Sequence, residues 1–192
     1  MAALGEIEDA VVAARGAGAT EICLLQCASL YPAPPHIMNL RAIPTMAAAF
    51  GVPVGLSDHT LGIHIAVAAV GRGAMYIEKH FTLDRALDGP DHQASLDPEQ
   101  LRGLIRAIRD VEAALGDGVK GPTRNELPIR DVARKSLVAA RDLPAGTIVG
   151  PDDLVILRPG TGLPPGAMTQ VLGRKTARAI PADTPLSEDM LL

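Results

Sequence analysis

Val54-Gly55-Leu56-Ser57-Asp58-His59-Thr60 is a short apolar run that ends in a polar cluster, and Tyr76-Ile77-Glu78-Lys79-His80-Phe81 repeats the pattern. An Ala- and Val-rich segment with helical character, residues 61–72, separates the two. Such runs are typical of buried parallel strands that carry chemistry at their carboxyl ends. In a right-handed strand-helix-strand unit, the two imidazoles would emerge at the same edge of neighbouring strands.

Side-chain alternation along these strands predicts two different faces. Ser57, His59, Glu78 and His80 fall on one face, as on the inward side at the top of a (β/α) barrel. The opposite face is apolar enough to pack on helices, and Lys79 belongs to it as a packing residue. Either histidine alone could be structural, but two histidines at equivalent strand ends favour a site.

The other elements of residues 1–116 extend the same pattern. We expect helices over residues 3–15, 39–50 and from about 97 to 116, and a buried strand over residues 21–27. The last helix has a start signal around Ser95 and Asp97. A helix followed by three strand-helix units predicts part of an α/β layer or barrel.

The chain changes character after Gly116. Residues 117–134 are rich in Gly, Pro and charge, without a clear period, and are predicted to be a linker. Residues 135–192 carry short β-like runs, Lys135–Ala140, Leu154–Leu157 and Thr176–Ile180, which indicate a small separate domain. Residues 141–147 resemble residues 178–184, which predicts two pseudo-symmetric halves.

Composition excludes several classes of protein. The chain has 192 residues, 47% of them hydrophobic, and a net charge of -4, which argues against a nucleic-acid surface. Aromatic residues make up only 2%, so stacking platforms for bases are not expected. We expect no membrane span and a cytoplasmic location, with Cys23 and Cys27 as reduced thiols.

Five motifs together resemble the sialic acid (N-acetylneuraminate) synthase family. They are Cys27 to Pro34, Gly55 to Thr60, Glu78 to Asp84, Gly89 to His92 and Arg158 to Gly162. The resemblance implies a fold of the α/β class: the C-terminal portion of a (β/α)8 TIM barrel, about three strands, followed by a small β-rich SAF (antifreeze-like) domain. The expected boundaries are 1–116 for the partial barrel, 117–134 for the linker and 135–192 for the SAF domain.

The resemblance also implies an enzyme, a transferase of carbohydrate biosynthesis. It would condense phosphoenolpyruvate with an N-acetylated aldose such as N-acetylmannosamine and release phosphate. By motif matching, His59 and His80 are the ligands of a divalent metal, typically Mn2+ in the family with Mg2+ or Co2+ as alternatives, and both are expected to be catalytic. Glu78 is added to the catalytic set because it lies on the His80 face, where it could orient a ligand or bind sugar. The residues matched to substrate binding are Ser57 for phosphoenolpyruvate, Tyr31 and Asp91 for the sugar, Arg158 for its N-acetyl group, and Ser29 where some members carry Asn.

Residue chemistry agrees with the implied metal site. Two neutral imidazoles leave several coordination positions open, which suits a six-coordinate ion that also holds substrate oxygen and water. A Lewis acid at the sugar aldehyde would make its carbon electrophilic. The family pattern further implies a homodimer in which the SAF domain covers the partner's site.

The resemblance leaves alternatives open. About three strands cannot close a barrel, and the family's phosphate-binding lysines have no counterpart here, so we expect an N-terminally truncated chain that is inactive alone. The alternatives are a non-catalytic binding or assembly module with a SAF domain, or a gene remnant. A metal-dependent aldolase would explain the histidine pair but neither Arg158 nor the repeat. The sequence does not decide which sugar is used.

Overall fold

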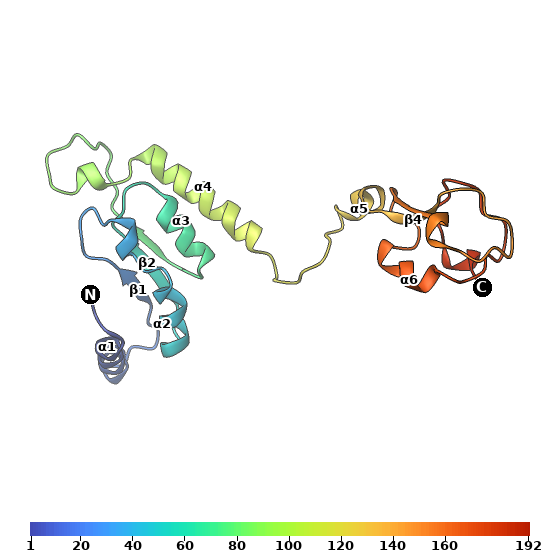
Figure 1. The fold of residues 1–192 in the computed structure, drawn as a ribbon. Helices are drawn as coiled ribbons and strands as arrows, with labels where there is room; N and C mark the ends of the chain where they lie inside the picture. Colours follow the sequence, from blue (N-terminus) through green and yellow to red (C-terminus); the bar gives the residue numbers. More distant parts are fainter. The chain divides into compact units, whose positions relative to one another are not determined.

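The computed structural model describes residues 1–192, which divide into two compact units. Unit 1 is Met1–Val119 and unit 2 is Lys120–Leu192 (Figure 1). None of the helices has the length and apolar composition needed to cross a bilayer.

Unit 1 is a mixed α/β unit built on one small parallel sheet. Its elements are α1 (Leu4–Gly16), β1 (Leu24–Cys27), α2 (Ala42–Phe50), β2 (Val54–Asp58), α3 (His64–Gly71), β3 (Ile77–Lys79) and α4 (Pro98–Leu115), with 3₁₀ turns at Pro35–Ile37 and His92–Ala94. The strands are ordered β1-β2-β3, all parallel, so that α2 and α3 each connect adjacent strands. The predicted strand-helix alternation is confirmed.

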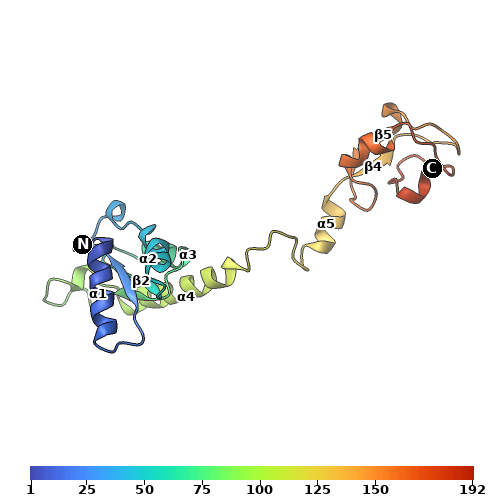
Figure 2. The ribbon, with the colours of Figure 1, turned by 90° about the horizontal axis from the view of Figure 1, so that it is seen from below.

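The helices pack on one face of this sheet. Val54 and Leu56 of β2 share a buried cluster with Ile43 and Met46 of α2 and Ala69 of α3. Figure 2 shows α2 and α3 on the same side of β2. The alternation of β2 explains the arrangement, because every second residue of the strand points toward the helices. The other face is left to Gly55, Ser57 and the residues beyond the strand ends.

Gly55 lets β2 and β3 approach closely. A Cβ atom at this position would lie 2.4 Å from the carbonyl oxygen of Tyr76 and 2.7 Å from its Cβ. Only a residue without a side chain fits, so the glycine sets the spacing that brings the two strand ends together.

α4 begins and packs as its sequence indicates. The Asp97 carboxylate accepts a hydrogen bond from the Gln100 amide at 2.8 Å, and the Gln100 side chain accepts one from the Asp97 amide. This reciprocal cap fixes the first turn. Leu104 then packs with Ala66 of α3 and Leu96 in a second buried cluster.

One predicted element of unit 1 is partly wrong. Residues 21–27 were expected to form a buried strand, but only Leu24–Cys27 is extended and paired, and Leu25 is exposed. The strand lies at the edge of the sheet, and the helices cover only one of its faces. A continuous apolar run therefore does not distinguish an edge strand from a central one.

Unit 2 is small and β-rich. Its elements are α5 (Leu127–Ala133), β4 (Ser136–Ala139), β5 (Leu154–Leu157) and α6 (Met168–Val171), with 3₁₀ turns at Pro151–Asp153, Pro165–Ala167 and Glu188–Met190. β4 and β5 pair antiparallel. Leu137, Leu143, Ile180 and Leu186 are almost fully buried in one cluster.

Unit 2 has the two pseudo-symmetric halves that its sequence repeat predicts. Leu143 and Ile180, equivalent positions of the repeat, donate backbone hydrogen bonds to each other at 2.8 Å in both directions. Other backbone pairings occur twice, once for each copy of the repeat. Ala139 pairs with Leu154, and the equivalent residue Thr176 pairs with Leu191. The repeat is therefore structural and not only a recurrent turn.

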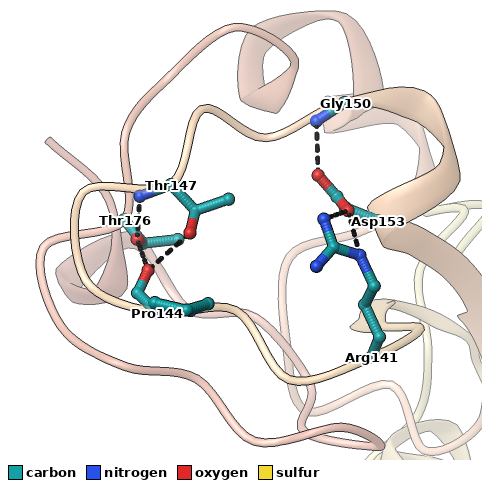
Figure 3. A network of polar contacts seen from close by, with 6 residues as sticks. All are labelled: Arg141, Pro144, Thr147, Gly150, Asp153 and Thr176. Carbon is teal, nitrogen blue, oxygen red and sulfur yellow. Dashed lines mark hydrogen bonds and ion pairs between the residues drawn. The ribbon is translucent and has the colours of Figure 1, made fainter.

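Polar side chains, of which Thr176 and Asp153 are buried, tie the turns of unit 2 together (Figure 3). The hydroxyl groups of Thr147 and Thr176 both donate to the Pro144 carbonyl, at 2.7 and 2.6 Å. Nearby, Asp153 accepts from the Gly150 amide at 2.9 Å and from the Arg141 guanidinium at 2.8 Å. Turn amides and carbonyls that have no strand partner are satisfied in this way.

One prediction for unit 2 is wrong, and one helix was not predicted. Residues 117–134 were expected to be a linker, and α5 occupies Leu127–Ala133 within this segment. Residues Thr176–Ile180 were expected to form a strand, but they make only isolated bridges. In both places the segments are short, and a short segment carries too few residues for a period to be recognised.

Candidate functional site

The carboxyl ends of β2 and β3 bring four of the predicted site residues together. Ser57, His59, Glu78 and His80, together with Lys79, line a cavity of about 280 Å³. The ring centroids of His59 and His80 lie 5.3 Å apart. The pairing explains this: Asp58 and Lys79 are register partners, so the next residue of each strand is a histidine.

His59 is buried and its ring is oriented by a backbone group. Its Nδ1 lies 3.0 Å from the carbonyl oxygen of Ala28, which can only accept, so Nδ1 carries the proton. The lone pair is then on Nε2, the arrangement found in metal-ligating histidines whose second nitrogen is held by a carbonyl. The thiol of Cys27 lies 3.8 Å from the same Nδ1.

His80 is half-buried and faces the loop that carries Asp91. Its Nδ1 lies 3.9 Å from the Asp91 carboxylate, an exposed group. The Thr82 hydroxyl lies 2.8 Å from the His92 ring nitrogen, and this contact anchors the loop next to Asp91. The structure therefore brings Asp91 to the histidine pair.

Tyr31 lies against both imidazoles. Its ring centroid is 4.1 Å from that of His59 and 5.5 Å from that of His80, while 57% of the residue remains exposed. The loop is held because the Ala33 amide donates to the His59 carbonyl at 2.9 Å. Tyr31 and Asp91 also line a neighbouring cavity of about 640 Å³ that includes Arg85.

Ser57 and Glu78 form a hydrogen-bonded pair between the strands. The Ser57 hydroxyl donates to the Glu78 carboxylate at 2.6 Å. A hydroxyl has one proton, so a serine that donates to Glu78 offers only its lone pairs to any other group. For Ser57 to donate to a phosphate oxygen, the hydroxyl would have to rotate away from Glu78.

Two other predicted residues lie apart from this cluster. Ser29 is exposed and contacts Cys27 at 3.8 Å between oxygen and sulfur, on the wall of a cavity of about 680 Å³ beside β1. Arg158 belongs to unit 2, where its Nε donates to the Ala133 carbonyl at 2.9 Å.

The sequence prediction assigned Lys79 to apolar packing and missed its charge partner. The Lys79 ammonium lies 2.8 Å from the Asp58 carboxylate, and both side chains are buried. A signal was present in the sequence, because an acidic residue precedes one histidine and a basic residue precedes the other. The Ala28 carbonyl that orients His59 gave no side-chain signal.

The histidine pair fits a divalent cation in part. Two rings bound to one ion, at about 2.1 Å from each nitrogen, can have the observed centroid spacing of 5.3 Å. No third His, Cys, Asp or Glu of the chain completes a three-residue cluster of this kind. Such an ion would take its other ligands from substrate oxygens, water or groups outside the chain.

Comparisons with known proteins show the family to which the chain belongs. Residues 1–120 match the NeuB family, and residues 134–192 match the SAF domain. N,N'-diacetyllegionaminic acid synthase of Legionella pneumophila is 48% identical over 165 residues, which are 86% of this chain and 46% of the relative. The protein of the same name from Campylobacter jejuni is 46% identical over 176 residues, 91% of this chain and 53% of the relative.

A solved structure of a similar protein also aligns with the chain. The N-acetylneuraminic acid (sialic acid) synthetase of Leptospira borgpetersenii, in complex with citrate, aligns with a TM-score of 0.61 at 37% identity. The alignment covers 67% of this chain and 45% of that one. The chain thus spans about half the length of the relatives it matches.

Proposed function

We propose that this chain, which belongs to the NeuB family and carries a SAF domain, takes part in a sugar-acid synthase reaction. In this reaction phosphoenolpyruvate is joined to an N-acetylated aldose. A carbon-carbon bond forms between the enol carbon and the aldehyde carbon, water adds at the phosphate-bearing carbon, and phosphate leaves. We further propose that unit 1 forms part of a (β/α) barrel.

The convergence of His59 and His80 beside Ser57 and Glu78 is the observation that supports this function. Both imidazoles present nitrogen donors to one cavity, and His59 has its Nε2 free. A divalent cation held there, for which Mn2+ is the first candidate, would supply Lewis acidity to the sugar aldehyde. Glu78 controls the direction of the Ser57 hydroxyl through their hydrogen bond. That hydroxyl would contact the phosphate or carboxylate of phosphoenolpyruvate.

The sugar subsite is assigned to the cavity that adjoins the histidines. Tyr31 offers an aromatic surface, and Asp91 offers a carboxylate that can accept hydrogen bonds from sugar hydroxyls. Ser29 and Arg158 are proposed as further sugar contacts, Arg158 from the SAF domain of a partner subunit in a homodimer. The Lys79 ammonium is bound to Asp58, so the cavity of this chain offers no free cation for phosphate. We therefore expect the phosphate-binding cations to come from outside the cavity described here.

A chimera tests this function most sharply. Residues 1–192 replace the matching segment of the L. pneumophila synthase, and phosphate release is measured with phosphoenolpyruvate. The second substrate is the diacetamido aldose that remains when a pyruvate unit is removed from that enzyme's product. We expect turnover that depends on a divalent cation and that is lost in His59→Asn and in His80→Asn.

The matched control is His36→Asn, because His36 is exposed and lies outside the site cavity. This variant should keep the turnover of the chimera. A folded chimera with no turnover, or one whose turnover survives both site substitutions, would contradict the proposal.

A further inference from the structure

An ion pair lies on the reverse side of the two strands that carry the histidines. Asp58 and Lys79 are the last register partners of β2 and β3, and their charged groups are 2.8 Å apart. The side chains are 0% and 5% exposed. Because side chains alternate along a strand, the next residues, His59 and His80, point to the opposite face.

The same ion pair also holds the residue that follows His59. The Lys79 ammonium donates to the Thr60 carbonyl at 2.6 Å, and the second carboxylate oxygen of Asp58 accepts from the Thr60 amide at 2.9 Å. The backbone that follows His59 is thereby fixed by two side chains from neighbouring strands. Rotation of this backbone would move the imidazole away from the Ala28 carbonyl that sets its tautomer.

We propose that Asp58 and Lys79 are positioning residues that keep His59 and His80 side by side for a shared ligand. They set the register of the two strand ends and clamp the backbone after His59, so the imidazoles need not be held by contacts with each other. The inference rests on the proposed function, since it takes the two histidines as the ligands of one cation.

A purely structural role makes a different prediction. A buried ion pair can often be replaced by neutral residues of similar volume without loss of stability, whereas removal of one partner leaves an unpaired charge. The double variant Asp58→Asn/Lys79→Met removes both charges at similar volume, and the carboxamide that replaces the carboxylate keeps an oxygen that can accept from the Thr60 amide. If the pair served only stability, this folded variant would leave the histidine rings unchanged.

The test is nuclear magnetic resonance of the histidine rings in the 192-residue chain without metal or substrate. In the unaltered chain we expect the His59 proton on Nδ1 and a nuclear Overhauser effect between the His59 and His80 rings. In the double variant we expect the His59 proton to move to Nε2, as in free histidine, and the inter-ring effect to be lost. The control, Arg109→Gln/Glu112→Gln, removes an exposed ion pair of α4 and should keep both signals.

A conservative variant keeps the test independent of folding losses. Lys79→Arg retains a cation that can donate to both Asp58 and Thr60, so both signals should persist. Unchanged signals in the folded double variant would overturn the proposal, as would their loss in folded Lys79→Arg. Because no cation is added, a failure of the proposed synthase function would leave this result standing.

Discussion

One ion pair of unit 1 and one ion pair of unit 2 differ sharply in burial. In unit 1 the Asp58–Lys79 pair is buried beneath the two histidines and bonds to the backbone between the strand ends. In unit 2 the Arg178–Asp189 pair lies on the surface, with 58% and 64% of its side chains exposed. Burial therefore decides whether such a pair is costly to break, as we expect for Asp58–Lys79, or contributes little to stability, as we expect for Arg178–Asp189.

The two units also differ in how they complete their backbone hydrogen bonds. In unit 2 the two pseudo-symmetric halves supply hydrogen-bond partners to each other. Leu143 of one half and Ile180 of the other exchange backbone hydrogen bonds. Unit 1 has a three-stranded sheet whose helices cover one face. The uncovered face is the one that carries Ser57 and Glu78. The face of unit 1 that the helices leave uncovered is therefore available for ligands.

The largest expected effect comes from breaking the buried ion pair on one side only. Lys79→Met leaves the Asp58 carboxylate buried without a cation, which should lower the free energy of unfolding of unit 1 by about 3–5 kcal/mol. Urea unfolding followed by tyrosine fluorescence measures this selectively, because the chain has no Trp and both tyrosines, Tyr31 and Tyr76, lie in unit 1.

Arg178→Gln is the matched control in unit 2. Its ion pair is exposed, so we expect no measurable change in the free energy of unfolding of unit 2, followed by amide hydrogen exchange because unit 2 has no tyrosine. Equal losses in the two variants would remove the contrast between the units.

The symmetry of unit 2 predicts two equal costs. Leu143→Ala and Ile180→Ala each remove a side chain that is almost fully buried, and each should cost about 2–5 kcal/mol of unit 2 stability. Amide hydrogen exchange at these two positions reports the loss, and tyrosine fluorescence should not change. Strongly unequal costs would show that the two halves do not share the core equally.

The close approach of β2 and β3 predicts a smaller effect in unit 1. Gly55→Ala places a Cβ atom 2.4 Å from the Tyr76 carbonyl oxygen, so the strands must separate. We expect this to lower the free energy of unfolding of unit 1 by about 1–3 kcal/mol. Tyrosine-monitored unfolding measures the change. Gly71→Ala at the end of α3, where nothing lies within 4 Å, should be neutral; a neutral Gly55→Ala would argue against the tight strand spacing.

The smallest effect concerns acid stability of unit 2. The Ser187 hydroxyl, with the Arg178 guanidinium adding to it, holds the pKa of Asp189 below its ordinary value. A lowered folded-state pKa stabilises the fold above the unfolded-state pKa, and this contribution is lost as the pH falls through the folded-state pKa. Ser187→Ala should therefore raise the pKa of Asp189, measured by carboxyl titration in nuclear magnetic resonance; no rise would contradict the assignment.

The sequence predicted the features of unit 1 that follow from the alternation of side chains along its strands. The alternation along residues 54–60 and 76–81 placed Ser57, His59, Glu78 and His80 on one face, and the structure brings them to one cavity. The ends of helices were less accurate, since α3 begins at His64 and not at residue 61. Helix starts depend on capping contacts and turns, which a hydrophobic pattern does not contain.

Other features could not be predicted because they arise from tertiary contacts. Whether the strand at residues 24–27 is central or at the edge depends on what pairs with it. The Ala28 carbonyl acts on His59 through the fold and not through its residue type. The Asp58–Lys79 pair required the register of β2 and β3, which alternation alone does not give.

We propose that His59 and His80 bind one divalent cation together. The most direct measurement is a titration of the 192-residue chain with Mn2+, followed by paramagnetic broadening of the histidine ring signals. We expect the His59 and His80 signals to broaden together at low metal concentration, and either His59→Asn or His80→Asn to remove the effect from the remaining partner. Broadening of only one of the two rings, or broadening confined to exposed carboxylates elsewhere, would contradict it.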